Sequence, residues 1–261
     1  PVTLELGGKS PTVIDEAVAL GMAAERICFG KTLNAGQTCV APDYVLLPDS
    51  RRDAFVEAMR QQFTRLYPSV ADNEDYTSVI DDRHFKRLQA MLDDARDKGA
   101  TLVPLNAAGE AIPPGSRKLP LTLVLDPTDA MTVMREEIFG PILPVLGLAD
   151  INDALAYVNA RPRPLAMNLF VDDGPLRQAF LHRSHAGGVC INDAVFHVGV
   201  DDLPFGGTGD SGMGSYHGKE GFVTFSHPKS VFSRPRLNTA AMLYPPYGGW
   251  LQKLVMKLFL R

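Results

Sequence analysis

The sequence has no long apolar run, no paired cysteines and no excess of positive charge. No apolar segment reaches the roughly 20 residues that a membrane-spanning helix needs. The three cysteines, Cys28, Cys39 and Cys190, show no CxxC pairing, which argues against a disulfide framework or a zinc site. We therefore expect a protein of the reducing cytoplasm without a bound metal. A net charge of −4 gives no general attraction to polyanions, so we expect no nucleic-acid partner.

What the sequence does contain is the composition of a globular protein, with 45% hydrophobic and 21% charged residues. The chain starts at Pro1 without a methionine, and Val2–Leu6 already alternates as a strand does. Because a core strand needs the elements that precede it, we expect the sequence to be a fragment whose amino-terminal part lies elsewhere.

Strand-like and helix-like segments alternate along most of the chain. The predicted strands are Val2–Leu6, Pro11–Ile14, Tyr44–Leu47, Leu102–Leu105, Leu121–Leu125, Ile142–Leu146, Met167–Val171 and Gly188–Ile191. The predicted helices run from about Asp15 to Asn34, Ser50 to Leu66, Asp82 to Lys98, Asn152 to Asn159 and Pro175 to His185. This alternation predicts an α/β fold with a largely parallel sheet flanked by helices on both faces.

The last part of the sequence differs from this pattern. Asp201–Gly221 carries seven glycines in 21 residues, which is typical of a tightly turning loop near a site. Phe222–Phe232 then alternates as a strand would. A Pro- and Gly-rich linker leads into a short final helix, 250–261, in which a basic residue recurs every fourth position on an otherwise apolar surface. We expect this helix to dock on the protein, and weak contact with a membrane surface is the alternative.

Cys39 is the first candidate for chemistry. It follows Gly36 in a loop directly after a predicted helix, and small residues let the backbone approach a substrate closely. The reactive form of a thiol is the thiolate, which backbone N–H groups or a nearby cation would have to stabilise. A lone cysteine is more often buried and inert, and Cys28 and Cys190 fit that interpretation because they lie within a predicted helix and strand.

Two acidic positions are further candidates. Glu5 lies on the polar face of the Val2–Leu6 strand, where a partly buried carboxylate would suit a general base; an edge-strand glutamate facing solvent is the alternative. In the segment Glu136–Pro141, the carboxylate of Glu137 would suit ribose hydroxyls and the ring of Phe139 a nicotinamide. On its own, this segment could equally be a turn before a strand.

Together these segments resemble the motifs of the aldehyde dehydrogenase family, in the family's order and over about residues 1–238. Leu4–Pro11 resembles the glutamate motif, Gly36–Cys39 the cysteine motif and Glu136–Pro141 the nicotinamide-ribose motif. Leu203–Gly207 with Ser211–Gly214 is similar to the glycine-rich active-site loop.

Within the family the chain is most similar to the class 3 branch, and there to the bacterial coniferyl aldehyde dehydrogenases. The segments that carry this are Gly36–Tyr44, Ser215–Gly218 and Thr224–His227. Tyr216 stands where other branches have a glutamate proposed to relay protons. His84 matches a position that elsewhere holds a glutamine near the cofactor.

The resemblance implies an NAD- or NADP-dependent oxidation of an aldehyde, either coniferyl-type aromatic or medium-chain, through a cysteine thioester. Cys39 would be the nucleophile and Glu5 the base, and the cofactor-binding residues would be Leu6, His84, Glu137 and Phe139. It also implies a catalytic domain over residues 1–221, an oligomerisation strand region over 222–238 for a homodimer, and a linker with the amphipathic helix over 239–261. The cofactor-binding domain, with one oxyanion donor, would belong to the missing part, so we expect this half alone to be inactive.

Two alternatives remain from the sequence. One is a thiol hydrolase that pairs Cys39 with a histidine such as His217, although the segment around Glu137 and Phe139 has no role in that reaction. The other is an inactive truncated fragment that serves only in oligomer contacts.

Overall fold

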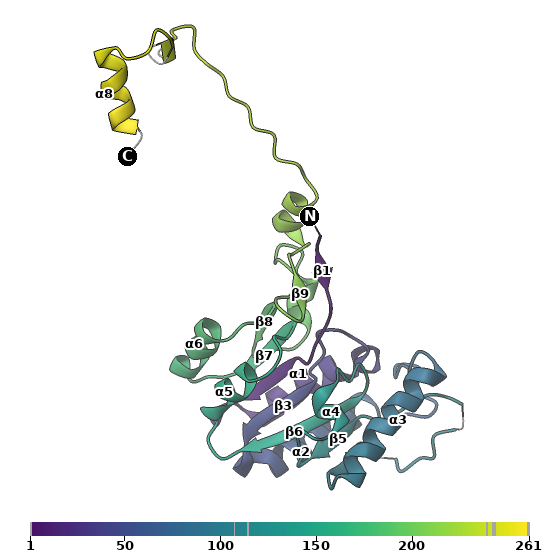
Figure 1. Ribbon diagram of the computed structural model, residues 1–261. Helices are drawn as coiled ribbons and strands as arrows, with labels where there is room; N and C mark the ends of the chain where they lie inside the picture. Colours follow the sequence, from purple (N-terminus) through teal and green to yellow (C-terminus); the bar gives the residue numbers. More distant parts are fainter. Residues whose placement is uncertain (1, 107, 114, 239, 242–243, 260–261) are drawn as a thin grey trace. The chain divides into compact units, whose positions relative to one another are not determined.

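A computed structural model describes residues 2–106, 108–113, 115–238, 240–241 and 244–259 (Figure 1). It separates the chain into two units, Pro1–Phe225 and Ser226–Arg261. The first unit contains the main sheet, which has the strand order β4-β5-β6-β3-β2-β7-β8. Its strands are β2 (Pro11–Ile14), β3 (Tyr44–Pro48), β4 (Thr101–Pro104), β5 (Thr122–Leu125), β6 (Ile142–Leu148), β7 (Ala166–Phe170) and β8 (Gly188–Ile191).

The main sheet is parallel except for the antiparallel pair β4 and β5. Every residue of the central strands β2, β3 and β7 is buried. Such uninterrupted burial is typical of parallel strands that have helices on both faces. The α/β fold predicted from the alternation of segments is therefore confirmed.

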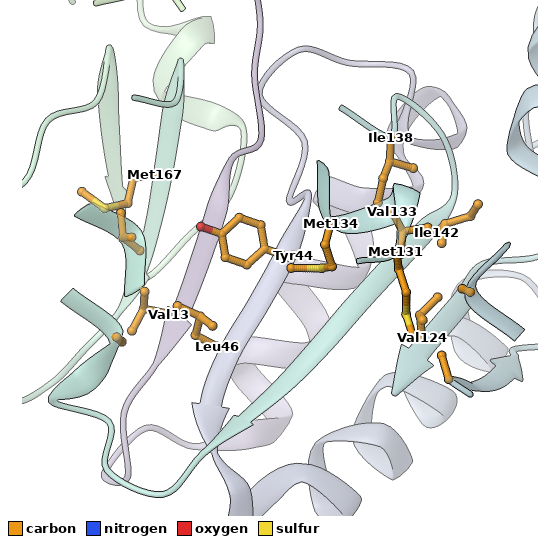
Figure 2. Packing of buried hydrophobic residues seen from close by; sticks show 14 of the residues in the cluster. Val13, Tyr44, Leu46, Val124, Met131, Val133, Met134, Ile138, Ile142 and Met167 are labelled. Atoms are coloured by element: carbon orange, nitrogen blue, oxygen red, sulfur yellow. The ribbon is translucent and has the colours of Figure 1, made fainter. Parts of the chain in front are cut away.

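Helices cover both faces of this sheet. The first face packs against α1 (Leu20–Thr32) and α2 (Arg52–Leu66). The second packs against α3 (Asp82–Asp97), α4 (Thr132–Arg135), α5 (Asp153–Asn159) and α6 (Gly174–Arg183). Figure 2 shows the core on the second face, where Tyr44 and Leu46 of β3 lie between Val13 of β2 and Met134 of α4. Burial of apolar side chains at about 25 cal/mol per Å² is the main term that holds these layers together.

Helix α1 begins at Leu20 and not near Asp15 as the sequence suggested. The Asp15 carboxylate accepts hydrogen bonds from four main-chain N–H groups. They belong to Ala17 (2.9 Å), Val18 (3.0 Å), Asp172 (2.6 Å) and Asp173 (2.8 Å). Asp15 therefore closes the turn after β2 and ties it to the end of β7, which is a different use of a carboxylate from a helix cap.

A second, two-stranded sheet pairs β1 (Leu4–Glu5) with β9 (Gly212–Met213) in antiparallel register. The predicted Val2–Leu6 strand is thus present but short. Glu5 lies opposite Gly212, so this pairing brings the glycine-rich loop alongside the candidate base. The short 3-10 helices η1 (Leu33–Gly36), η2 (Asp49–Arg51) and η3 (Phe196–Gly199) complete the connections.

The prediction of a strand over Phe222–Phe232 is wrong. Its first residues belong to helix α7 (Gly218–Thr224), and residues 226–232 have no regular secondary structure. An alternating pattern makes a strand only where a neighbouring strand supplies hydrogen bonds, and residues 222–232 pair with no strand in the described part of the chain. The oligomerisation role expected for this region stays a prediction.

The second unit ends in helix α8 (Trp250–Phe259), none of whose residues is buried. Lys253 and Lys257 of the predicted basic stripe lie on it, while Leu260 and Arg261 lie outside the described residues. Among the described residues, no helix is both long enough and apolar enough to cross a membrane.

Candidate active site

The three candidate segments lie directly before three neighbouring strands. Glu5–Lys9 leads into β2, Cys39–Asp43 into β3 and Glu136–Gly140 into β6. Because β6, β3 and β2 are adjacent and parallel, their amino ends meet at one edge of the sheet. The sheet order therefore brings together residues that are far apart in the sequence.

The Gly7-Gly8 turn holds two carboxylates side by side. The N–H of Gly7 donates to Glu5 Oε1 at 2.8 Å, and the N–H of Gly8 donates to Glu137 Oε2 at 3.1 Å. Gly7 has a φ of +75°, and a Cβ atom there would lie 2.5 Å from Glu137 Oε2. Only glycine fits this position without strain. The predicted base and the predicted ribose ligand thus accept from two successive N–H groups.

The loop before Cys39 is shaped by left-handed backbone and by one side chain. Residues 34–36 have φ values of 52°, 53° and 73°, so the chain leaves α1 in a tight turn. The Gln37 side chain donates to the Ser78 carbonyl at 3.2 Å and accepts from the Ile80 N–H at 2.9 Å. These bonds fix the loop against the segment that precedes α3.

The thiol of Cys39 is half-buried, whereas those of Cys28 and Cys190 are buried. Burial raises the pKa of the Cys39 thiol, the carboxylates of Glu5 and Glu137 raise it further, and the main-chain N–H groups at positions 39 and 40 lower it. The N–H groups expected from the sequence are therefore present, but burial and negative charge outweigh them. The Cys28 thiol, at a pKa of about 12 because of its burial, fits the inert interpretation.

Cys39 lies at the margin of a small apolar cluster. Cys39 packs beside a buried cluster that includes Val40 and Val195, together with Phe205. The ring of Phe205 lies 5.4 Å from that of Tyr216, centroid to centroid. Burial, followed by the charges of Glu5 and Cys39, raises the pKa of Tyr216. Tyr216 thus lies near Glu5 and Cys39 as a neutral phenol, which can donate a hydrogen bond but cannot act as a carboxylate base.

The predicted cofactor residues lie partly together. Leu6 and Glu137 line one cavity of about 510 Å³ with the Gly7-Gly8 turn between them, a size that suits a small ligand or part of a larger one. Burial raises the pKa of Glu137 to about 7, against the influence of the Gly8 N–H. Phe139 is 41% exposed with a φ of 47° and is not among the residues that line this cavity.

His84 lies in the first turn of α3, where its main-chain N–H donates to Asp81 at 2.7 Å. Among the described residues that line the cavity beside Glu137, His84 is absent. Its contact with a cofactor therefore stays a prediction, as do the catalytic and binding roles of the other candidates.

Charged residues that the sequence reasoning missed support this site. Lys9 forms an ion pair with Asp43, and Arg87 of α3 donates to the carbonyl oxygens of Glu137 at 3.3 Å and Ile138 at 2.5 Å. Lys9 and Asp43 both lie within motif segments, and this position in the sequence could have indicated them. The sequence gives no such indication for Arg87, because a single arginine in an amphipathic helix is ordinarily a solvent-exposed residue.

The chain is similar to known proteins over most of its length. The family model described as "Aldehyde dehydrogenase family" matches residues 1–231. A "Probable coniferyl aldehyde dehydrogenase" of Pseudomonas aeruginosa is 58% identical over 261 residues, which are 100% of this chain and 54% of that protein. The chain thus spans about half the length of the curated relatives that it matches.

Solved structures agree. The "substrate bound state" of Staphylococcus aureus AldH matches with a TM-score of 0.89 and 40% identity, covering 100% of this chain and 55% of that one. A Mycobacterium tuberculosis aldehyde dehydrogenase complexed with NAD+ matches with a TM-score of 0.74 and 32% identity, over 85% of this chain and 46% of that one. The chain belongs to the aldehyde dehydrogenase family.

Proposed function

We propose that this chain supplies the thiol, the base and the ribose-binding carboxylate of an NAD- or NADP-dependent aldehyde dehydrogenase. The observation that carries the proposal is the meeting of Cys39, Glu5 and Glu137 at the amino ends of three adjacent strands, with the Gly7-Gly8 turn joining the two carboxylates. An isolated thiol hydrolase would have no use for the cavity beside Glu137.

The residues around this cavity fit a nicotinamide riboside. The cavity of about 510 Å³ that Leu6 and Glu137 line has space for such a group. A Cβ atom at Gly7 would lie against the Glu137 carboxylate. The half-buried Glu137 carboxylate, which has one neutral donor in Gly8, keeps acceptor capacity for ribose hydroxyls. The NAD+ in the M. tuberculosis relative supports this assignment. When bound, the oxidised nicotinamide supplies the hydride acceptor.

The residues of this chain perform the remaining steps. The Cys39 thiolate attacks the aldehyde carbonyl carbon, and its own main-chain N–H donates to the developing oxyanion. Loss of hydride from the former carbonyl carbon leaves an acyl thioester on Cys39. Glu5 takes a proton from water, which attacks this thioester, and the carboxylic acid departs as the thiol is regenerated. Glu5 lies in β1 and is held by the N–H of Gly7.

The aldehyde that we propose is a coniferyl-type aromatic or a medium-chain aldehyde. Its support is the 58% identity to the "Probable coniferyl aldehyde dehydrogenase" of P. aeruginosa and the apolar cluster with Val195 against which both Cys39 and Phe205 pack. Either tail would bury apolar area there.

A substrate panel on the full-length protein, run with NAD+ and with NADP+, tests the proposal. Cys39→Ala should abolish aldehyde oxidation, while Cys190→Ala, which alters a strand cysteine, should retain it. Oxidation that persists in Cys39→Ala would remove the assignment. Residues 1–261 alone should show no oxidation, because the chain spans about half of its relatives' length.

Assembly and tail contacts are proposed separately. We expect a homodimer, which analytical ultracentrifugation of the full-length protein would show. Residues 226–261 carry six lysines or arginines and no acidic residue, so α8 suits either an acidic protein surface or anionic lipid. Removal of residues 250–261 without any change in sedimentation with liposomes would count against membrane contact.

A further inference from the structure

A largely buried ion pair lies in the wall of the cavity, where Lys9 is one of the lining residues, and it has no part in the chemistry above. Lys9 comes just before β2 and Asp43 directly before β3, and their side chains are 16% and 4% exposed. Lys31 of α1 is 1% exposed, and burial lowers its pKa to about 8 against the influence of the Asp43 carboxylate. Removing such charges from water is costly, so their positions call for a physical reason.

The ion pair forms hydrogen bonds with the main chain on both sides of Glu137. Lys9 Nζ donates to the carbonyl oxygens of Val133 at 2.7 Å and Glu136 at 2.9 Å. Asp43 Oδ2 accepts from the N–H of Ile138 at 3.0 Å. The peptide groups that enter and leave residue 137 are thus held by charge-assisted hydrogen bonds, which are stronger than neutral ones.

Other contacts complete this support. Arg87 donates to the carbonyl oxygens of Glu137 and Ile138. The side chains of Val133 and Ile138 point into the core, where Figure 2 shows them on the second face of the sheet. The Glu137 side chain itself reaches forward to one main-chain donor, Gly8. Its place in the cavity therefore depends on how its own main chain is held.

We propose that Lys9 and Asp43 are positioning residues that hold the Glu137 carboxylate where it can accept hydrogen bonds from the cofactor ribose. This proposal rests on the function proposed above and adds the part of the site that makes the ribose contact precise. The pair joins the glutamate, cysteine and ribose segments, because one member precedes β2, the other precedes β3, and both bind the segment before β6.

A positioning role predicts a split between two activities of one site. Neither Lys9 nor Asp43 is among the groups that set the pKa of Cys39, which are Glu5, Glu137 and main-chain N–H groups together with burial. Loss of the pair should therefore weaken the cofactor step and spare the thiol. A merely structural role would impair both alike.

The experiment uses the full-length protein with Lys9→Met. We expect the KM for NAD+ or NADP+ to rise about tenfold, the loss expected when a charge-assisted hydrogen bond is removed. Hydrolysis of p-nitrophenyl acetate, which needs Cys39 and Glu5 but no cofactor, should stay within about twofold of wild type. Arg52→Met is the matched control, since it removes an ion pair with Asp126 (2.6 Å) on the partly exposed surface of α2 and should change neither value.

Each outcome decides a different point. Wild-type protein without nicotinamide-dependent oxidation would overturn the proposed function and the positioning role with it. An active wild type whose Lys9→Met variant keeps its cofactor KM, or loses ester hydrolysis in equal proportion, would overturn the positioning role alone. Asp43→Asn is tested beside Lys9→Met, and replaces it if that variant does not fold, because Asp43 is not among the described residues that line the cavity and the amide keeps the shape of its side chain. A raised cofactor KM with normal ester hydrolysis in Asp43→Asn supports the proposal, and an unchanged KM overturns it.

Discussion

Gly36 offers a direct test of how the cysteine loop is held against the ribose segment. It has a φ of +73°, and a Cβ atom there would lie 2.4 Å from the carbonyl oxygen of Gly140, although real Cβ contacts are almost never under 3.0 Å. Gly36→Ala must therefore separate the two segments by at least about 0.6 Å. Because reacting groups tolerate little misplacement, we expect kcat/KM for aldehyde oxidation to fall about 10- to 100-fold. Backbone strain and overpacking together should cost about 2–4 kcal/mol of stability.

The matched control is Gly99→Ala. Gly99 follows α3 with a φ of +93°, and a Cβ atom there would meet nothing within 4 Å. It isolates the backbone strain, which should cost about 1 kcal/mol, and should leave kcat/KM unchanged. Urea unfolding and steady-state kinetics of both variants in the full-length protein make the comparison. A Gly36→Ala enzyme with kcat/KM within twofold of wild type would refute the reasoning.

Three further predictions concern charge and burial. Because the pKa of Glu137 is raised from 4.5 to about 7, the folded state holds this proton more tightly, and its contribution to stability falls as pH rises from about 4.5 to 7. Glu137→Gln should then be more stable than wild type above pH 7 by about 1 kcal/mol after solvent screening, with no difference below pH 4.5 in urea unfolding; an equal difference at all pH values would contradict this. Asp15→Ala loses the acceptor for four N–H groups and should destabilise the protein by about 3 kcal/mol; a loss under 1 kcal/mol by chemical denaturation would argue against that role. Iodoacetamide should label Cys39 faster as pH rises past 9 and faster in Glu5→Gln, because the Glu5 carboxylate raises the thiol pKa, and mass spectrometry should find Cys28 unlabelled; equal labelling of both thiols would be inconsistent with their burial.

Local patterns in the sequence predicted the central elements well. Pro11–Ile14 and the strand beginning at Tyr44 are apolar runs of strand length between turn residues, and burial on both faces gives such runs one stable outcome. The pattern failed where its meaning depends on a distant partner. The sequence predicts that a helix begins near Asp15, but part of the hydrogen bonding of this residue goes to the residues that follow β7. The alternating segment Phe222–Phe232 pairs with no strand among the residues that the structure describes.

In the site, too, local patterns predicted single residues but not their distant partners. The motifs indicated Cys39, Glu5 and Glu137 one by one, but spacing along the chain does not tell which strands are neighbours. Once β6, β3 and β2 lie side by side, the support that Lys9 and Asp43 give to the main chain around Glu137 follows from their places before two of these strands. The raised pKa of Cys39 could not be predicted from the sequence either, because it arises from burial and from two carboxylates that the fold brings near.

The most direct test of the central claim is to trap the acyl group on Cys39. In the full-length Glu5→Gln variant, mixing aldehyde with the oxidised cofactor should give a burst of about one equivalent of reduced cofactor, followed by slow turnover. Mass spectrometry of the tryptic peptide 32–51, in which Cys39 is the one cysteine, should then show the added acyl mass. A burst without acylation of this peptide, or turnover at the wild-type rate, would contradict the account.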